Sequence, residues 1–172
     1  LKAFAPIVIA SVASTALSRS VFGDFPAFVL DANIITSFWE FPAFVMLGLI
    51  SGAVAIIFMR SIFLAQDLAE KSKLPIWIRP MIAGLMVGII ALFYPQVLGI
   101  GYGATESALL MQFGFTALVA IGVAKIVATA FSIGWGFAGG VFSPALVIGA
   151  MAGGSFGFAA TAVFPDLSSG AA

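Results

Sequence analysis

The groups best placed to do chemistry are backbone amides in the stretch GWGFAGGVFSPALVIGAMAGG, residues 134–154, which has no charged side chain. Glycine permits backbone conformations that other residues resist, so four closely spaced glycines favour a bend. These are Gly134, Gly136, Gly139 and Gly140. Pro144 suits the first turn of a helix, because the N–H that proline lacks has no helical partner there. We therefore expect a helix to start at about Phe142.

The start of such a helix is suited to binding an anion. The first N–H groups of a helix have no partner within the helix, and the helix dipole makes this end positive. Transporters repeatedly aim the N-termini of broken helices at anionic substrates. The alternative is a glycine kink filled by neighbouring helices, with Ser132 or Ser143 capping the free donors.

The composition excludes most other kinds of site. The 172 residues contain no cysteine and no histidine, which removes disulfides, thiolate chemistry and imidazole catalysis. Seven basic and seven acidic residues cancel, so nothing in the net charge points to nucleic acid. We expect no enzyme activity, no metal and no cofactor.

The same composition predicts a membrane protein. Hydrophobic residues make up 62% of the chain and charged residues 8%, with a mean hydropathy of +1.21; soluble domains are about 45–50% apolar and about 25% charged. In lipid the backbone must satisfy its own hydrogen bonds, which favours helices. We expect an all-α, polytopic integral membrane helical bundle with broken helices, part of a larger fold and of a single transmembrane domain. The expected helices cover about 3–19, 38–66, 76–95, 107–132 and 142–164.

Charged residues predict the orientation. Four basic residues lie in the connection between the second and third segments, namely Arg60, Lys71, Lys73 and Arg79. The connection over residues 21–38 contains none. Because basic loops stay in the cytoplasm, we expect 60–79 inside and 21–38 outside, with Arg60 ending a helix at the cytoplasmic face. We expect the cell (inner) membrane as the location.

Lys125 lies within an apolar segment, where a charge is costly. It either adds positive potential for anions on the cytoplasmic side, or reaches the interface or an acidic partner elsewhere.

Glycines also recur four residues apart, at Gly48 and Gly52, at Gly84 and Gly88, and at Gly149, Gly153 and Gly157. This spacing predicts close packing between helices.

Several stretches resemble one known family. GGVFSPALVIGAMAGGSFG resembles the Gly-x-Phe-x-Pro signature of the CLC family of voltage-gated-type chloride channels and chloride/proton antiporters. The signature falls on Gly140, Val141, Phe142, Ser143 and Pro144. VAKIVATAFSIGWGFAGG is similar to the helix and glycine loop before it, and FVMLGLISGAVAIIFMRSIFLAQDL and IRPMIAGLMVGIIALFYPQVLGIGYG look like the two earlier helices. The resemblance covers nearly the whole chain in the family's order.

The resemblance implies a site and an assembly. The N–H groups of Val141 and Phe142 would line a chloride site, with Ser143 beside them. Gly139 and Gly140 would let the backbone approach the ion, and Pro144 would start the helix behind it. CLC proteins are homodimers with a pore in each subunit, so we expect a homodimer, with part of the dimer face in the first segment.

The sequence also departs from the family pattern. We find neither the Gly-Ser-Gly-Ile-Pro-like stretch that supplies a serine to the ion nor the Gly-Lys/Arg-Glu-Gly-Pro stretch with the gating glutamate. We therefore expect this chain to supply one wall of a chloride pathway, with channel and antiporter both open. The alternatives are a structural or assembly subunit whose glycine loop packs helices, and a secondary transporter of organic anions.

Overall fold

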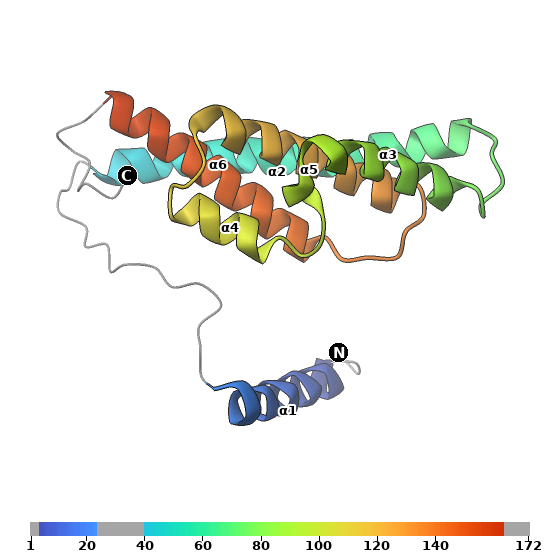
Figure 1. Cartoon of the computed structure of the whole chain (residues 1–172), viewed down its shortest axis with the longest axis horizontal. Coiled ribbons are helices and arrows are strands. Elements are labelled where there is room, and N and C mark those ends of the chain that lie inside the picture. Colours follow the sequence, from blue (N-terminus) through green and yellow to red (C-terminus); the bar gives the residue numbers. More distant parts are fainter. Residues whose placement is uncertain (1–3, 24–39, 164–172) are drawn as a thin grey trace. The chain divides into compact units, whose positions relative to one another are not determined.

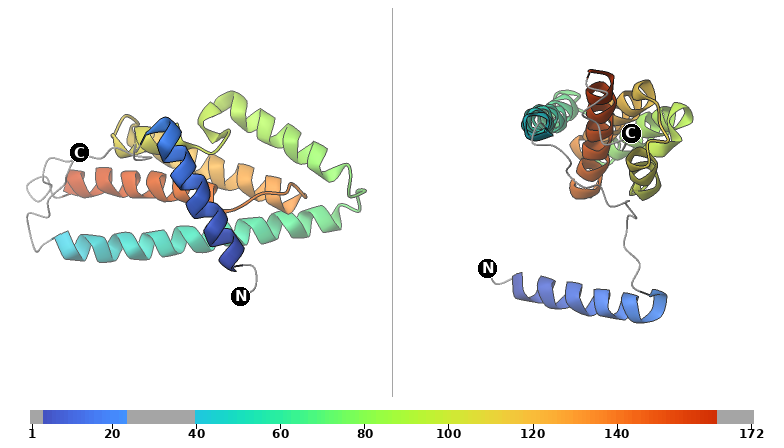
Figure 2. Two further views of the ribbon diagram at one scale, coloured as in Figure 1. Left: turned by 90° about the horizontal axis from the view of Figure 1, so that it is seen from below. Right: turned by 90° about the vertical axis from the view of Figure 1, so that its left-hand side faces the viewer.

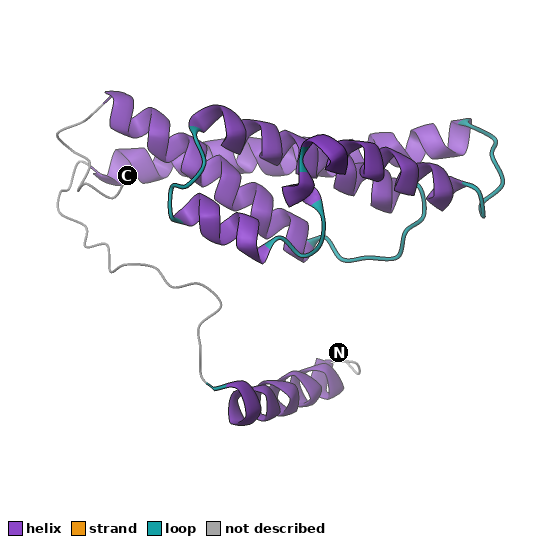
Figure 3. Ribbon diagram, viewed as in Figure 1, coloured by secondary structure: helices purple, strands orange, loops and turns teal. Residues whose placement is uncertain are grey.

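A computed structural model describes residues 4–23 and 40–163 of the chain (Figure 1). Its elements are α1 (Phe4–Phe22), α2 (Glu40–Lys71), α3 (Arg79–Phe93), the 3-10 helix η1 (Pro95–Val97), α4 (Tyr102–Leu109), α5 (Phe115–Gly134) and α6 (Phe142–Val163). Within these described ranges every regular element is a helix (Figure 3), which confirms the all-α prediction.

In the part of the chain that the structure describes, four helices are long and apolar enough to cross a membrane: α1, α2, α5 and α6. Together with the composition, they make this a multi-pass membrane chain. Helix α2 has 32 residues, which at about 1.5 Å per residue gives roughly 48 Å, longer than a bilayer core of about 30 Å. The expectation that Arg60 ends this helix is wrong, because α2 continues through Arg60 to Lys71.

The expected helix over 107–132 is two helices, α4 and α5. Helix α4 closes with two backbone hydrogen bonds, from Gln112 N–H to the Ser107 carbonyl (2.9 Å) and from Met111 N–H to the Ala108 carbonyl (3.2 Å). Met111 has φ +52°, the left-handed conformation that this type of helix end requires. Glycine is the usual residue there, so the sequence gives little warning of the break.

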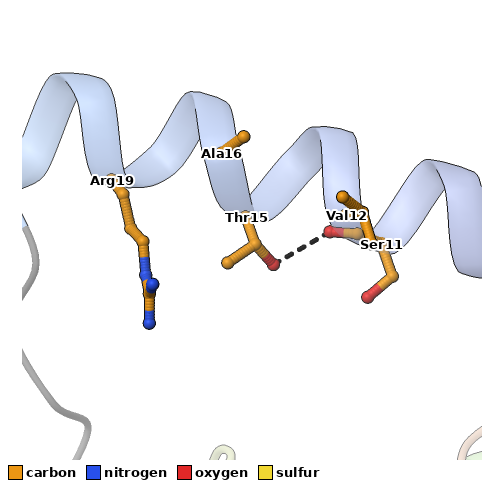
Figure 4. A pocket seen from close by; sticks show the side chains of 5 residues that line it. All are labelled: Ser11, Val12, Thr15, Ala16 and Arg19. Carbon is orange, nitrogen blue, oxygen red and sulfur yellow. Dashed lines mark hydrogen bonds between the residues drawn. The ribbon is translucent and has the colours of Figure 1, made fainter.

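The chain divides into two compact units, residues 1–31 and 32–172. In the first unit, α1 buries none of its residues. The polar side chains of Ser11, Thr15 and Arg19 border a groove along this helix (Figure 4). The Thr15 hydroxyl donates a hydrogen bond to the Ser11 carbonyl at 2.8 Å.

In the second unit α6 lies alongside α2 (Figure 2), and each of two apolar clusters includes residues of α5 and α6. The first joins α4, α5 and α6 and contains Ala104, Ala108, Leu118, Ile121, Val147 and Met151. The second joins α2, α5 and α6 and contains Phe58, Ile62, Ala65, Ala130 and Ile148. Helices α5 and α6 therefore form the centre of this unit.

Helices α5 and α6 cross closely at single glycines. A Cβ atom on Gly122 would lie 3.3 Å from the Met151 Cβ, and one on Gly154 would lie 3.1 Å from Leu118 Cδ1. The contact partner moves forward along α6 as the position moves back along α5, so the two helices are antiparallel.

Most of the glycines spaced four residues apart do not lie at a contact between helices of the described residues. A Cβ atom would meet nothing within 4 Å at Gly48, Gly52, Gly88, Gly149 or Gly153. Only Gly84 and Gly157 of that set face a side chain, Phe137 and Met111 respectively. Within the described residues, the close crossings of α5 and α6 instead use Gly122 opposite Met151 and Gly154 opposite Leu118.

Candidate anion site at the start of helix α6

Helix α5 ends in a glycine-dependent reversal. Phe137 N–H donates to the Ser132 carbonyl at 2.9 Å, and Gly136 N–H donates to the Ile133 carbonyl at 3.2 Å. This pair of bonds is a Schellman motif, which needs a left-handed residue just past the helix end. Gly136 supplies it with φ +102°. The predicted bend is confirmed, and Gly136 makes it.

Gly134 has a different role from the one expected. A Cβ atom there would lie 2.6 Å from the Ala65 Cβ and 2.9 Å from the Ala65 carbonyl carbon. Contacts this short would push the α2 backbone away, so Gly134 allows α5 to pack directly on α2. It does not make the bend.

Helix α6 starts at Phe142, the expected residue. The Ala145 N–H donates to the Val141 carbonyl at 3.0 Å, which makes Val141 the N-cap and places Ser143 and Pro144 in the first turn. Among the described residues, the N–H groups of Val141 and Phe142 have no hydrogen-bond acceptor.

The capping alternative has no hydrogen bond to support it within residues 40–163. The Ser132 hydroxyl donates back to the Ala128 carbonyl at 2.8 Å, inside α5. No hydrogen bond of the described chain joins the Ser143 hydroxyl to a donor at the start of α6. The first-turn donors are therefore left for another partner.

The start of α6 is open in this chain. Val141 is 45% exposed and Phe142 is 81% exposed, while Ser143 and Pro144 are half-buried. A Cβ atom on Gly139 or Gly140 would meet nothing within 4 Å, and neither residue has a positive φ. These two glycines therefore do not make the bend, and they leave the backbone accessible beside the free donors.

Helix α6 contributes no charged side chain to the electrostatics of its own start. Helix α6 has no acidic residue in its first turn and no basic residue in its last turn. The helix dipole adds a positive end there, equivalent to about half an elementary charge. Within the described residues, no group of three metal-ligating side chains occurs. The arrangement is thus suited to an anion held by backbone N–H groups.

Among the described residues, Lys125 is held by backbone carbonyls, and no ion pair with an acidic side chain is formed there. It is 4% exposed, and its Nζ donates to the backbone carbonyls of Val97 (2.7 Å) and Gly99 (3.0 Å). A lysine at a membrane-helix centre costs roughly 2.5–3.5 kcal/mol. Hydrogen bonds to charged groups contribute about 1.5–3 kcal/mol each, so the two bonds offset that cost. In place of the expected acidic partner, the described residues supply two backbone carbonyls.

The carbonyls that hold Lys125 belong to a turn over residues 97–101, which the sequence interpretation missed. Gly99 and Gly101 have φ +68° and +88°. A Cβ atom on Gly101 would lie 2.5 Å from Val147 Cγ2 and 3.8 Å from Lys125 Nζ. The turn is therefore packed between α5 and α6. The only sequence signals were the glycines of GIGYG and a lysine in an apolar helix.

The chain matches one protein family over its whole length. Residues 1–172 match the family described as voltage gated chloride channel. The chain is 34% identical over 168 residues to "Chloride channel protein CLC-f" of Arabidopsis thaliana, covering 92% of this chain and 22% of that protein. It is 32% identical over 127 residues to "H(+)/Cl(-) exchange transporter ClcA" of Yersinia pestis, covering 72% of this chain and 27% of that protein. This chain thus spans about a quarter of the length of these relatives, and it belongs to the CLC, or voltage-gated chloride channel, family.

Proposed function

We propose that the protein carries chloride across a membrane and that this chain supplies one wall of the anion pathway. The observation that carries the proposal is the start of α6. Two successive N–H groups, those of Val141 and Phe142, have no acceptor in the described chain, and they lie at the positive end of a 22-residue helix. An accessible donor pair of this kind fits a small anion.

Chloride would exchange part of its water shell for these two N–H groups. Gly139 and Gly140 leave space for the ion to approach the backbone. Ser143 continues the first turn, and Pro144 holds the local backbone in helical geometry without adding an N–H. With no full charge in the first turn, binding stays weak enough for the ion to leave, as conduction requires.

The wider assembly is part of the same proposal. The chain would belong to a single transmembrane transport domain in the cell (inner) membrane and would act as a homodimer, with α1 at the dimer face. The two relatives are named as a channel and as a proton/chloride exchanger. The proposal concerns the anion site itself, which serves either mechanism. It assigns transport and no catalysis.

The test is chloride binding and flux in the full-length protein, comparing Phe142→Pro with Phe142→Ala. Proline removes the proposed donor N–H at a position where helices tolerate it, whereas alanine removes the ring and keeps the N–H. Losing a charge-assisted bond of about 1.5–3 kcal/mol should weaken chloride binding about tenfold or more. Titration calorimetry and proteoliposome efflux report the two quantities, and circular dichroism checks folding.

We expect Phe142→Ala to bind chloride nearly as well as the natural protein. A folded Phe142→Pro variant with unchanged binding and flux would overturn the assignment of this helix start as an anion site. It would favour the alternative in which GGVFSP only lets helices pack.

A further inference from the structure

The 97–101 turn is fixed from two sides. On one side, the Lys125 Nζ of α5 binds the carbonyls of Val97 and Gly99. On the other, Gly101 lies so close to Val147 of α6 that no side chain fits between them. The turn also starts α4, because Gly101 is its N-cap and the Gly101 carbonyl accepts from Thr105 N–H at 2.9 Å. The turn thus binds α5 through Lys125, packs on α6 through Gly101 and begins α4.

The contact at Val147 connects the turn to the proposed chloride site through helix α6. Val147 is fully buried, and it lies five residues after Phe142 in the uninterrupted helix α6. It packs in the cluster that contains Leu118 and Met151. Because close-packed interiors transmit small displacements, a shift of the turn against Val147 moves the first turn of α6 as well.

We propose that Lys125 is a positioning residue for the anion site. Its hydrogen bonds hold the 97–101 turn against Val147 and so fix where the N–H groups of Val141 and Phe142 point. This inference rests on the proposed function, since it concerns the same donors. It separates Lys125 from a purely electrostatic role, in which only its charge would matter.

Two substitutions disturb the turn in chemically different ways. Lys125→Met removes the hydrogen bonds and the charge with little change in side-chain length. Gly101→Ala keeps Lys125 but places a Cβ atom against Val147 Cγ2. Gly103→Ala is the matched control, because Gly103 lies two residues further on, in α4, with nothing within 4 Å of a Cβ atom.

We expect both Lys125→Met and Gly101→Ala to raise the chloride Kd on the order of tenfold, since small misplacements of a binding group are costly. Gly103→Ala should keep the natural Kd. Lys125→Arg should restore much of the lost affinity, because arginine also donates several hydrogen bonds. Calorimetry on the full-length protein in detergent gives the Kd values, and gel filtration with circular dichroism checks folding. If Lys125→Met does not fold, Lys125→Gln replaces it under the same prediction.

Natural chloride affinity in a folded Gly101→Ala variant would overturn the inference, even if Lys125→Met lost affinity, because a displaced turn would then leave the anion site unchanged. The Phe142→Pro variant distinguishes this failure from that of the proposed function. If Phe142→Pro loses chloride while Gly101→Ala binds normally, only the positioning role fails. If Phe142→Pro also binds normally, the site itself is wrongly assigned.

Discussion

Two glycine-rich connections adjoin the central helices α5 and α6, and they differ in how closely they are packed. The 97–101 turn is enclosed, with Gly101 against Val147 and two of its carbonyls held by Lys125. The link over residues 135–141 is open after Gly136, because a Cβ atom on Gly139 or Gly140 would meet nothing within 4 Å. Similar composition therefore gives a fixed support in one place and an accessible backbone in the other.

The enclosed turn should be the more sensitive of the two. Gly101→Ala introduces both a steric conflict with Val147 and a left-handed conformation at alanine. Overpacking costs about 1–3 kcal/mol and the left-handed backbone about 1–2 kcal/mol, so we expect the free energy of unfolding to fall by roughly 3 kcal/mol. Denaturant titration in detergent micelles measures this quantity. A change below about 1 kcal/mol would contradict the tight fit at Val147.

Within the open link, Gly136 should be the one glycine that stability requires. Gly136→Ala keeps the chain reversal but forces alanine to φ near +102°, which should cost about 1–2 kcal/mol of unfolding free energy. The neighbouring Gly139→Ala is the control, because its backbone is not left-handed and its surroundings are open. Equal losses in the two variants, in the same denaturant titration, would mean that the bend is not localised at Gly136.

The smallest effect on the unfolding free energy should come from Gly140→Ala, and this variant tests most directly whether the open link serves binding and not stability. With nothing within 4 Å of its Cβ atom, the unfolding free energy should stay within about 0.5 kcal/mol of the natural value. Chloride binding should nevertheless weaken by about threefold, because a methyl group next to Val141 narrows the approach to the donors and about 0.7 kcal/mol suffices for this change. Calorimetry gives the chloride affinity and denaturant titration gives the unfolding free energy of the same preparation, so the two effects are measured separately. Unchanged chloride binding would show that Gly140 faces away from the ion.

Part of this arrangement could be predicted from the sequence because local signals were strong. Pro144 and the preceding glycines predicted a helix start at Phe142, and the apolar runs predicted helices. The break between α4 and α5 could not be predicted, since Met111 adopts a conformation usually reserved for glycine. The partners of Lys125 were also hidden, because they are backbone carbonyls 26 and 28 residues earlier in the chain. Every residue has a backbone carbonyl, so residue types do not indicate which carbonyl a side chain will bind.

The position of those carbonyls has a consequence for biosynthesis. The chain is made from its N-terminus, so Val97 and Gly99 leave the ribosome before Lys125, the residue that they bind. When α5 enters the bilayer, the acceptors for its one charged side chain have already been made and lie on the same polypeptide. The hydrogen-bond acceptors that Lys125 requires are thus available when α5 is inserted, whereas the contact of the turn with Val147 forms only once α6 has been made.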